Sequence, residues 1–355
     1  MKNYYPILKK AIRYIITFEK TSVSYYPEKE RKSKWYIIGE NIRYLFRHGS
    51  LMKNYYSYGF DVKGVNMEDY FEEEDWASRR NRANGIYSKK LDYTCLIGNK
   101  ELFELVCKTH HLRVVVSLGT YQVGGNYFDI EKQTYMPLAE LLNFHPHLFF
   151  KPSASAKGKG AYAIDKGPSG LILNGVQKDY DSIIKELDEG GNEMIIQERL
   201  IQNKVINDIY PHSLNTLRVV SVLDDDEVVI ICALLRCGAE GRVVDNGSQG
   251  GILVGIGEDG WLYKYGYYLP KFGTKTDKHP DTHVVFESIQ IPFYKEVLKL
   301  VKDSHRVFKW IKTVGWDIAV LEDGPILIEG NSRYAGGAMQ ICCGGMKNIM
   351  NKYLK

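Results

Sequence analysis

Short segments with the period of a β-strand dominate the chain from residue 147 onward. In these segments apolar residues alternate with polar ones or form short continuous runs, which is typical of strands rather than helices. The segments are residues 147–151, 161–164, 194–198, 217–223, 228–236, 252–256, 317–321 and 325–329. Between residues 293 and 311 the apolar positions repeat at helical spacing instead. The pattern predicts an α+β fold of mostly antiparallel strands covered by helices.

The first part of the chain follows a different pattern. Its first hundred residues fit short helices, with polar breaks around residues 26–31 and 79–85. Asn99 is placed to cap a helix whose apolar face would contain Leu102, Phe103, Leu105 and Val106. Residues 113–118 then read as a buried strand. A helix followed by a strand predicts an α/β layer here.

The composition of the chain is typical of a globular protein. The chain has 355 residues, of which 44% are hydrophobic and 25% charged, so it can form a globular protein with a sizeable core. It contains no apolar run of transmembrane length, and its N-terminus lacks a signal-peptide core and cleavage site. We therefore expect a cytoplasmic location, with the inner face of the membrane as an alternative. The six cysteines lack paired C-x-x-C spacing, which predicts reduced thiols.

The positive charge is concentrated near the N-terminus. Residues 1–60 carry twelve Lys or Arg against four Asp or Glu, interleaved with fourteen aromatic residues. Such a region can form the outer layer of a helical subdomain, or it can contact anionic lipid or a glycan-assembly partner as a peripheral surface. No motif for RNA or DNA binding is present, and we expect no nucleic-acid partner.

The loop in residues 149–165, FFKPSASAKGKGAYAID, combines lysines with small residues. Backbone N–H groups and ammonium groups attract anions, and small residues let a phosphate approach closely. A P-loop is excluded because Gly160 follows Gly158-Lys159, and a dinucleotide fingerprint is excluded because a strand follows instead of a helix. The loop is predicted to be a phosphate flap between two strands, with a solvated hairpin tip as the alternative.

A second informative stretch is GWDIAVLEDGPILIEGNSRYAGG, residues 315–337. A turn at residues 322–324 would join two strands into a hairpin. Strict alternation places Leu327, Glu329 and Asn331 on one face of the second strand, with Asp317 close to them on the first. Two carboxylates and an amide oxygen suit Mg²⁺ better than zinc. Solvated charges on a hairpin are the alternative. The histidines show no metal-binding spacing and are interpreted as structural.

In this order, the flap, SLNTLRVV, DNGSQGGILVGI and DIAV…PILIEGN resemble the motifs of the ATP-grasp superfamily, and more narrowly of its sugar-transfer-associated branch. The resemblance covers residues 99–345, while residues 1–95 resemble the looser N-terminal part of that branch. It implies an ATP-grasp fold, in which two α+β subdomains sandwich ATP, after a helical and α/β N-terminal region. The expected parts are a basic, aromatic-rich, mostly helical region at residues 1–95, an α/β segment at 96–146, a lid subdomain with the flap at 147–200, and a C-terminal subdomain with the magnesium site at 201–355.

The resemblance also implies roles for individual residues. Arg218 and Arg236 would meet the transferred phosphoryl group, and Asn246 and Arg333 would contact substrate or phosphate. The residues implied to bind ATP are Lys100, Lys151, Ser153, Ser155, Lys157, Gly158, Gly160, Gln197, Glu198, Arg199 and Leu200. The residues implied to bind metal are Asp317, Glu329 and Asn331, which would hold two Mg²⁺ ions that Mn²⁺ can replace.

The implied activity is an ADP-forming ligation. A substrate carboxylate would take the γ-phosphoryl group of ATP, and an amine would displace phosphate from the acyl phosphate to give an amide. The branch points to a bacterial surface polysaccharide, or its sugar precursor, as the molecule modified. Two alternatives stay open: a kinase that phosphorylates a hydroxyl acceptor such as a sugar, and a non-catalytic scaffold that binds nucleotide. Relatives commonly form dimers, so a homodimer is an expectation as well.

Overall fold

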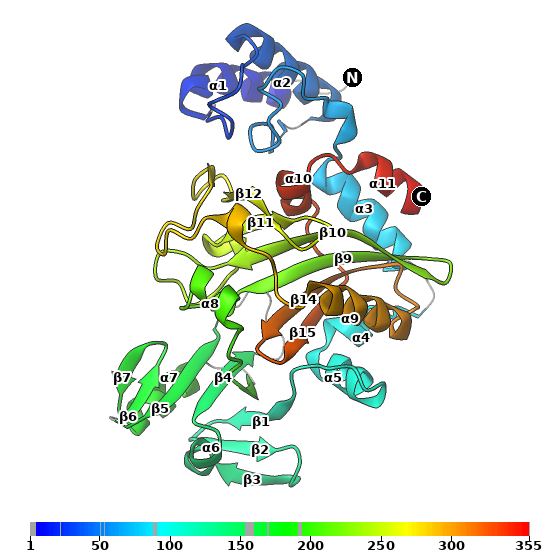
Figure 1. Cartoon of the computed structure of the whole chain (residues 1–355). Helices are drawn as coiled ribbons and strands as arrows, with labels where there is room; N and C mark the ends of the chain where they lie inside the picture. Colours follow the sequence, from blue (N-terminus) through cyan, green and yellow to red (C-terminus); the bar gives the residue numbers. More distant parts are fainter. Residues whose placement is uncertain are drawn as a thin grey trace.

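The computed structural model describes residues 5–21, 23–49, 51–52, 54–86, 88, 91–152, 160–168, 170–190 and 194–354. Two antiparallel sheets and the helices that cover them make up the fold (Figure 1). The predicted α+β class is therefore confirmed, and so are the strands predicted between residues 147 and 329.

The first sheet has eight strands and is built from the middle of the chain. Their order is β3 (Thr134–Pro137), β2 (Asn126–Asp129), β1 (Ser117–Gln122), β8 (Met194–Glu198), β4 (His147–Pro152), β5 (Tyr162–Gly167), β6 (Gly170–Leu173) and β7 (Val176–Lys178). Helices α6 (Leu138–Phe144) and α7 (Tyr180–Glu189) share its apolar core, to which Leu148, Phe150 and Ile183 contribute fully buried side chains. Strands from residues 96–146 and from residues 147–200 thus lie in one sheet.

The second sheet has seven strands and forms the centre of the molecule. Their order is β13 (Lys275–Thr276), β12 (Leu262–Tyr267), β11 (Ile252–Ile256), β10 (Glu227–Cys237), β9 (Thr216–Asp224), β14 (Thr313–Leu321) and β15 (Gly324–Asn331). One face shares a core with α4 (Cys95–Gly98), α5 (Lys100–Thr109), α8 (Lys204–Ile209) and α9 (Tyr294–Val307). Trp316 lies fully buried in this core.

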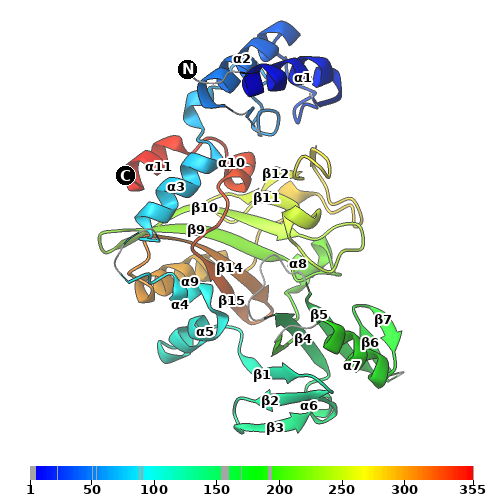
Figure 2. The same ribbon diagram turned by 180° about the vertical axis from the view of Figure 1, so that it is seen from behind.

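The opposite face of the second sheet packs against the N- and C-terminal segments. Its core joins residues of β9, β10 and β11 to α3 (Glu73–Ala83), α10 (Gly337–Cys343) and α11 (Lys347–Tyr353). Residues of α1 (Tyr5–Thr21) and α2 (Lys34–His48) belong to the same cluster. Seen from either side, α1 and α2 occupy one end of the molecule, beyond α10 and α11 (Figure 2). Short 3-10 turns at Met67–Asp69, Gly247–Gln249 and Phe286–Ser288 complete the fold.

Three local expectations are wrong. Residues 79–83 continue helix α3 rather than interrupting it, because Trp76 and Arg80 are buried and both donate to the carbonyl oxygen of Tyr334. In the predicted strand at residues 113–118, only the end from Ser117 belongs to a strand. Asn99 does cap α5, but the helix buries Phe103 and Cys107 and leaves Leu105 exposed. Tertiary packing, which periodicity over a few residues does not capture, decides each of these cases.

In the described parts of the chain, no helix combines the length and the apolar character needed to cross a bilayer. The six cysteines are free thiols, as predicted.

Candidate active-site cleft

A cleft of about 2050 Å³ is lined by residues of both sheets. Strands β4 and β8 contribute from the first sheet, and β9, β10, β14 and β15 from the second. The cleft brings together most of the residues singled out from the sequence, namely Lys100, Lys151, Gln197, Glu198, Arg199, Leu200, Arg218, Arg236, Asn246, Asp317, Glu329, Asn331 and Arg333. Gly160 directly precedes Ala161, which lines the cleft, whereas Ser153, Ser155, Lys157 and Gly158 lie outside the described residues.

At the floor of the cleft, two partly buried arginines surround a buried aspartate. Arg218 on β9 lies directly opposite Asp317 on β14 and donates to it through Nε at 2.5 Å and Nη2 at 3.0 Å. Arg236 on β10 donates to the same carboxylate through Nη1 at 3.1 Å. Burial raises the pKa of Asp317, but the charges of Arg218 and Arg236 outweigh burial and lower it to about 2. Asp317 is therefore ionised and fixes both guanidinium groups in place.

A second aspartate, which the sequence reasoning missed, supports this cluster. Asp245 accepts from Nη2 of Arg236 at 3.0 Å, and its other oxygen accepts from the backbone N–H and the hydroxyl of Thr216 at 3.1 and 2.5 Å. Arg236 is thus held between two carboxylates. Burial lowers its pKa, but the negative charges of Asp245 and Asp317 outweigh burial and raise it. Asp245 directly precedes Asn246 in the DNGSQGG stretch, which was the available signal.

Glu329 and Asn331 lie beside Asp317 on the neighbouring strand. Asp317 pairs with Glu329 across the hairpin, and Nδ2 of Asn331 donates to Oε1 of Glu329 at 3.1 Å and to Oδ2 of Asp317 at 3.4 Å. A register shift follows this pair, so Leu327 lies in the core and Ile328 lines the cleft. The placement of Leu327 on the same face as Glu329 is therefore wrong, because a bulge breaks the strict alternation.

The donor set around Glu329 fits magnesium. Burial first, and then the negative charge of Asp317, raise the pKa of Glu329. A divalent cation would offset this repulsion, and carboxylate and amide oxygens are its usual ligands. Among the described residues no group of three or more His, Cys, Asp or Glu is arranged to hold a metal. The third ligand would therefore be Oδ1 of Asn331, once its amide turns over.

Two lysines line the same cleft, and the charge of Glu329 acts on both of them. Lys151 projects from β4, and Lys100 begins α5 and donates from Nζ to the carbonyl oxygen of Pro152 at 2.7 Å. Burial, followed by the charge of Lys100, lowers the pKa of Lys151 to about 8. Burial also lowers the pKa of Lys100, although Glu329 opposes this shift. Two desolvated cations close to each other favour an anion between them.

Residues 197–200 connect the two sheets along the cleft. Gln197 is buried, and its Nε2 donates to the hydroxyl of Ser117 at 3.4 Å. The side chain of Arg199 donates to Asp165 at 2.6 Å, so it is tied to β5. Glu198 is exposed. The side chains of Gln197 and Arg199 are thus tied to strands of the first sheet.

The far end of the cleft is lined by Tyr44 and His48 of α2 and by residues 72–75 at the start of α3. Within that stretch, Glu73 accepts from the N–H groups of Gly336 and Gly337 at 3.1 and 2.6 Å, which ties α3 to α10. The cleft therefore continues from the charged floor to the N-terminal helices.

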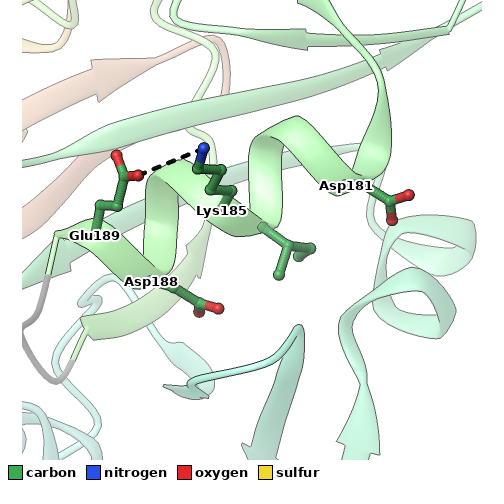
Figure 3. Close-up of a pocket in the computed structure, with 5 residues that line it drawn as sticks. Asp181, Lys185, Asp188 and Glu189 are labelled. Atoms are coloured by element: carbon green, nitrogen blue, oxygen red, sulfur yellow. Dashed lines mark ion pairs between the residues drawn. The ribbon is translucent and has the colours of Figure 1, made fainter.

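A smaller hollow of about 500 Å³ lies on helix α7, away from these residues (Figure 3). Lys185 pairs with Glu189 along the helix at 4.0 Å. Asp188 accepts from the hydroxyl of Tyr121 at 2.6 Å and from the N–H of Gly124 at 3.1 Å. These contacts hold the turn between β1 and β2, so the hollow has a structural explanation.

Comparison with known proteins gives a family and remote structural neighbours. The sequence model of the family described as "Sugar-transfer associated ATP-grasp" matches residues 81–352. No curated protein matches the chain.

Three similar solved structures illustrate the fold, and each is distant in sequence. An ADP complex of N5-carboxyaminoimidazole ribonucleotide synthetase has a TM-score of 0.40 and 11% identity, and the match covers 68% of this chain and 46% of that one. D-alanyl-alanine synthetase A from Vibrio cholerae has a TM-score of 0.40 and 10% identity, and the match covers 74% of this chain and 61% of that one. L-amino acid ligase from Bacillus licheniformis has a TM-score of 0.43 and 9% identity, and the match covers 78% of this chain and 52% of that one. The chain therefore covers less than two thirds of the length of each of these proteins.

Proposed function

The chain belongs to the sugar-transfer-associated ATP-grasp family, and from this premise we propose that it is an ATP-dependent ligase that joins a carboxylate to an amine. One observation carries the proposal: a single cleft is lined by two lysines, by two arginines and by the carboxylates of Asp317 and Glu329. Four cations in one cleft suit a polyphosphate, and neighbouring carboxylates suit the metal that accompanies it.

The lysines are assigned to the nucleotide. The ammonium groups of Lys151 and Lys100 bind phosphate oxygens, and residues 197–200 contact the adenine through the backbone. Because the pKa of Lys151 is lowered to about 8 by burial, a bound phosphate would restore its full charge. Asp317, Glu329 and Asn331 would hold magnesium, which would supply positive charge to offset that of the phosphates.

The arginines are assigned to the transferred phosphoryl group. Their planar donor groups suit charge spread over three oxygens, and Asp317 and Asp245 keep them oriented before the substrate arrives. Preorganised donors of this kind stabilise a transition state without reorganisation. We assign a substrate-binding role to Asn246 and Arg333, which line the same cleft.

The reaction balances without a nucleophilic side chain. An oxygen of the substrate carboxylate forms a bond to the γ-phosphorus, and the bond from that phosphorus to the β–γ bridging oxygen breaks, so ADP leaves. The amine nitrogen then bonds to the acyl carbon, phosphate leaves with the carbon–oxygen electron pair, and the nitrogen loses a proton. The products are an amide, ADP and phosphate. We propose a uronic or other sugar acid as the carboxylate, destined for a bacterial surface polysaccharide.

Trapping with hydroxylamine tests the proposal, because hydroxylamine replaces the unknown amine. The protein is incubated with ATP, Mg²⁺ and pooled uronic acids, sugar acids and amino acids, and hydroxamate and ADP are measured together. Equal amounts of both products are expected, and the Glu329→Gln variant should yield roughly a hundredth or less of either. ADP without hydroxamate would identify a kinase instead, and bound ATP with no product from any pool would favour a scaffold.

A further inference from the structure

Helix α1 has more apolar surface than its packing uses. Ala11, Tyr14 and Phe18 are buried against the rest of the protein. Leu8, Ile12, Ile15 and Ile16 remain exposed, Ile12 to 56% and Ile16 to 77%. At about 100° per residue, these four side chains form one continuous stripe beside the buried face. A stripe of this kind is costly in water and indicates a partner.

Basic side chains border this stripe. The helical rotation places Lys9 and Arg13 next to Ile16, and both are exposed. Helix α2 adds exposed Trp35, at 73%, and Phe46 on one of its faces, next to Arg43, Tyr36 and Arg47. The acidic residues of the two helices are Glu19 and Glu40, and Glu40 forms an ion pair with Lys32.

We propose that the exposed faces of α1 and α2 bind the surface of an anionic lipid bilayer. Apolar side chains next to lysines and arginines, with a tryptophan among them, are the features that hold a helix in the interface of such a membrane. The cations would lie at the headgroups and the stripe would insert into the acyl boundary. No helix in the described ranges spans a bilayer, so the contact is peripheral.

A second copy of this chain is a poorer occupant of the same surface. Two copies related by a two-fold axis perpendicular to α1 would place the edge with Lys9 and Arg13 against the same edge of the partner helix, and these like charges would repel each other. An anionic headgroup layer instead neutralises these charges while the stripe is buried. The charge pattern therefore favours lipid.

The position of the surface connects it to the cleft. Helix α2 presents Trp35 and Phe46 to solvent and lines the cleft with Tyr44 and His48. The helix pair also forms one end of the molecule (Figure 1). Binding through this end would hold the far end of the cleft close to the bilayer.

Sedimentation with vesicles tests the proposal on the full chain. Wild-type protein should sediment with vesicles of phosphatidylcholine and phosphatidylglycerol, less so at high salt, and not with phosphatidylcholine alone. The Ile12→Ser/Ile16→Ser variant should bind at least about tenfold more weakly. The Lys9→Ser/Arg13→Ser variant should lose about fivefold in vesicle affinity for each charge removed. Leu105→Ser, at an exposed position on α5, is the matched control and should bind like wild type.

Tryptophan emission gives an independent readout. Anionic vesicles should shift the wild-type emission to the blue, and the Trp35→Phe variant should lack this shift. Wild-type protein that stays in the supernatant, or variants that bind as tightly as wild type, would overturn the proposal. A wild-type dimer that Ile12→Ser/Ile16→Ser converts to a monomer, with no vesicle binding by either, would overturn it in favour of a second copy.

Discussion

The floor of the cleft buries a charged side chain, whereas helices α1 and α2 expose apolar side chains to solvent. In the cleft, Asp317 is only 2% exposed and is charged, held by two arginines. On α1, isoleucines face solvent although apolar residues are usually buried. Buried charges preorganise a site for a charged reaction, whereas exposed apolar side chains prepare a surface for a partner. Each region gives up stability for a different kind of recognition.

The largest effect is expected from Glu329→Gln. The substitution keeps the shape of the side chain but removes one of two carboxylates from the magnesium site, so turnover should fall roughly 10² to 10³-fold. The fold should keep its stability, because burial and Asp317 already disfavour the charge of Glu329. Steady-state ADP release and thermal unfolding measure both. Undiminished activity would refute the metal assignment, and the exposed Glu287→Gln is the control.

Asp317→Asn should be the most damaging change to stability. It leaves the partly buried Arg218 and Arg236 with less negative charge, and breaking a buried ion pair typically costs about 3–5 kcal/mol. Urea unfolding measures the loss. Asp323→Asn, at the turn of the same hairpin, removes an exposed ion pair with Arg113 and should change little. Equal losses in both variants would contradict the view that the cleft floor is a specialised buried cluster.

Nucleotide affinity should fall as the pH rises through 8. In the free protein Lys151 loses its proton near pH 8, because burial lowers its pKa, while a bound polyphosphate stabilises the protonated form. The nucleotide affinity is therefore highest below pH 8, and it declines above pH 8 by up to about tenfold per pH unit. Lys100, which also has a lowered pKa, adds in the same direction. Calorimetry with Mg-ADP should show that the affinity of Lys151→Arg depends less on pH than the affinity of wild type. An equal pH dependence in both proteins would contradict a role for Lys151 in binding the nucleotide.

The smallest effects belong to α1. Ile12→Ser/Ile16→Ser should change the free energy of unfolding by about 0.5 kcal/mol or less at each exposed position and leave ADP release unchanged. Denaturant unfolding in the absence of lipid checks this. A loss typical of core substitutions would mean that the stripe packs within the protein, and the contrast with the cleft would then fail.

Much of the fold was predictable because the strands of the two sheets are short segments that either alternate with the period of two or run continuously apolar. The same regularity placed Asp317, Glu329 and Asn331 near one another, which the structure confirms. The bulge beside Glu329, the continuous helix α3 and the second carboxylate on Arg236 were not predictable, since each depends on contacts between distant segments. The roles of Lys151, Arg218 and the metal ligands stay predictions.

The exposed stripe shows the same limit at the surface. The sequence showed a basic, aromatic N-terminus, but periodicity alone did not separate the aromatic residues that pack inside, such as Tyr14 and Phe18, from those that face solvent, such as Trp35. Only the packed structure distinguishes a covered face from an exposed one.

The measurement that tests the central claim most directly is calorimetric titration of Mg-ADP into wild type, Lys151→Met and Lys185→Met. Lys151 lines the cleft, whereas Lys185 lies on the outer hollow of α7 (Figure 3). Loss of one charge-assisted hydrogen bond should weaken binding about ten- to a hundredfold in Lys151→Met and leave Lys185→Met like wild type. Wild-type protein that fails to bind the nucleotide, or equal affinities in all three proteins, would contradict the assignment of this cleft as the ATP site.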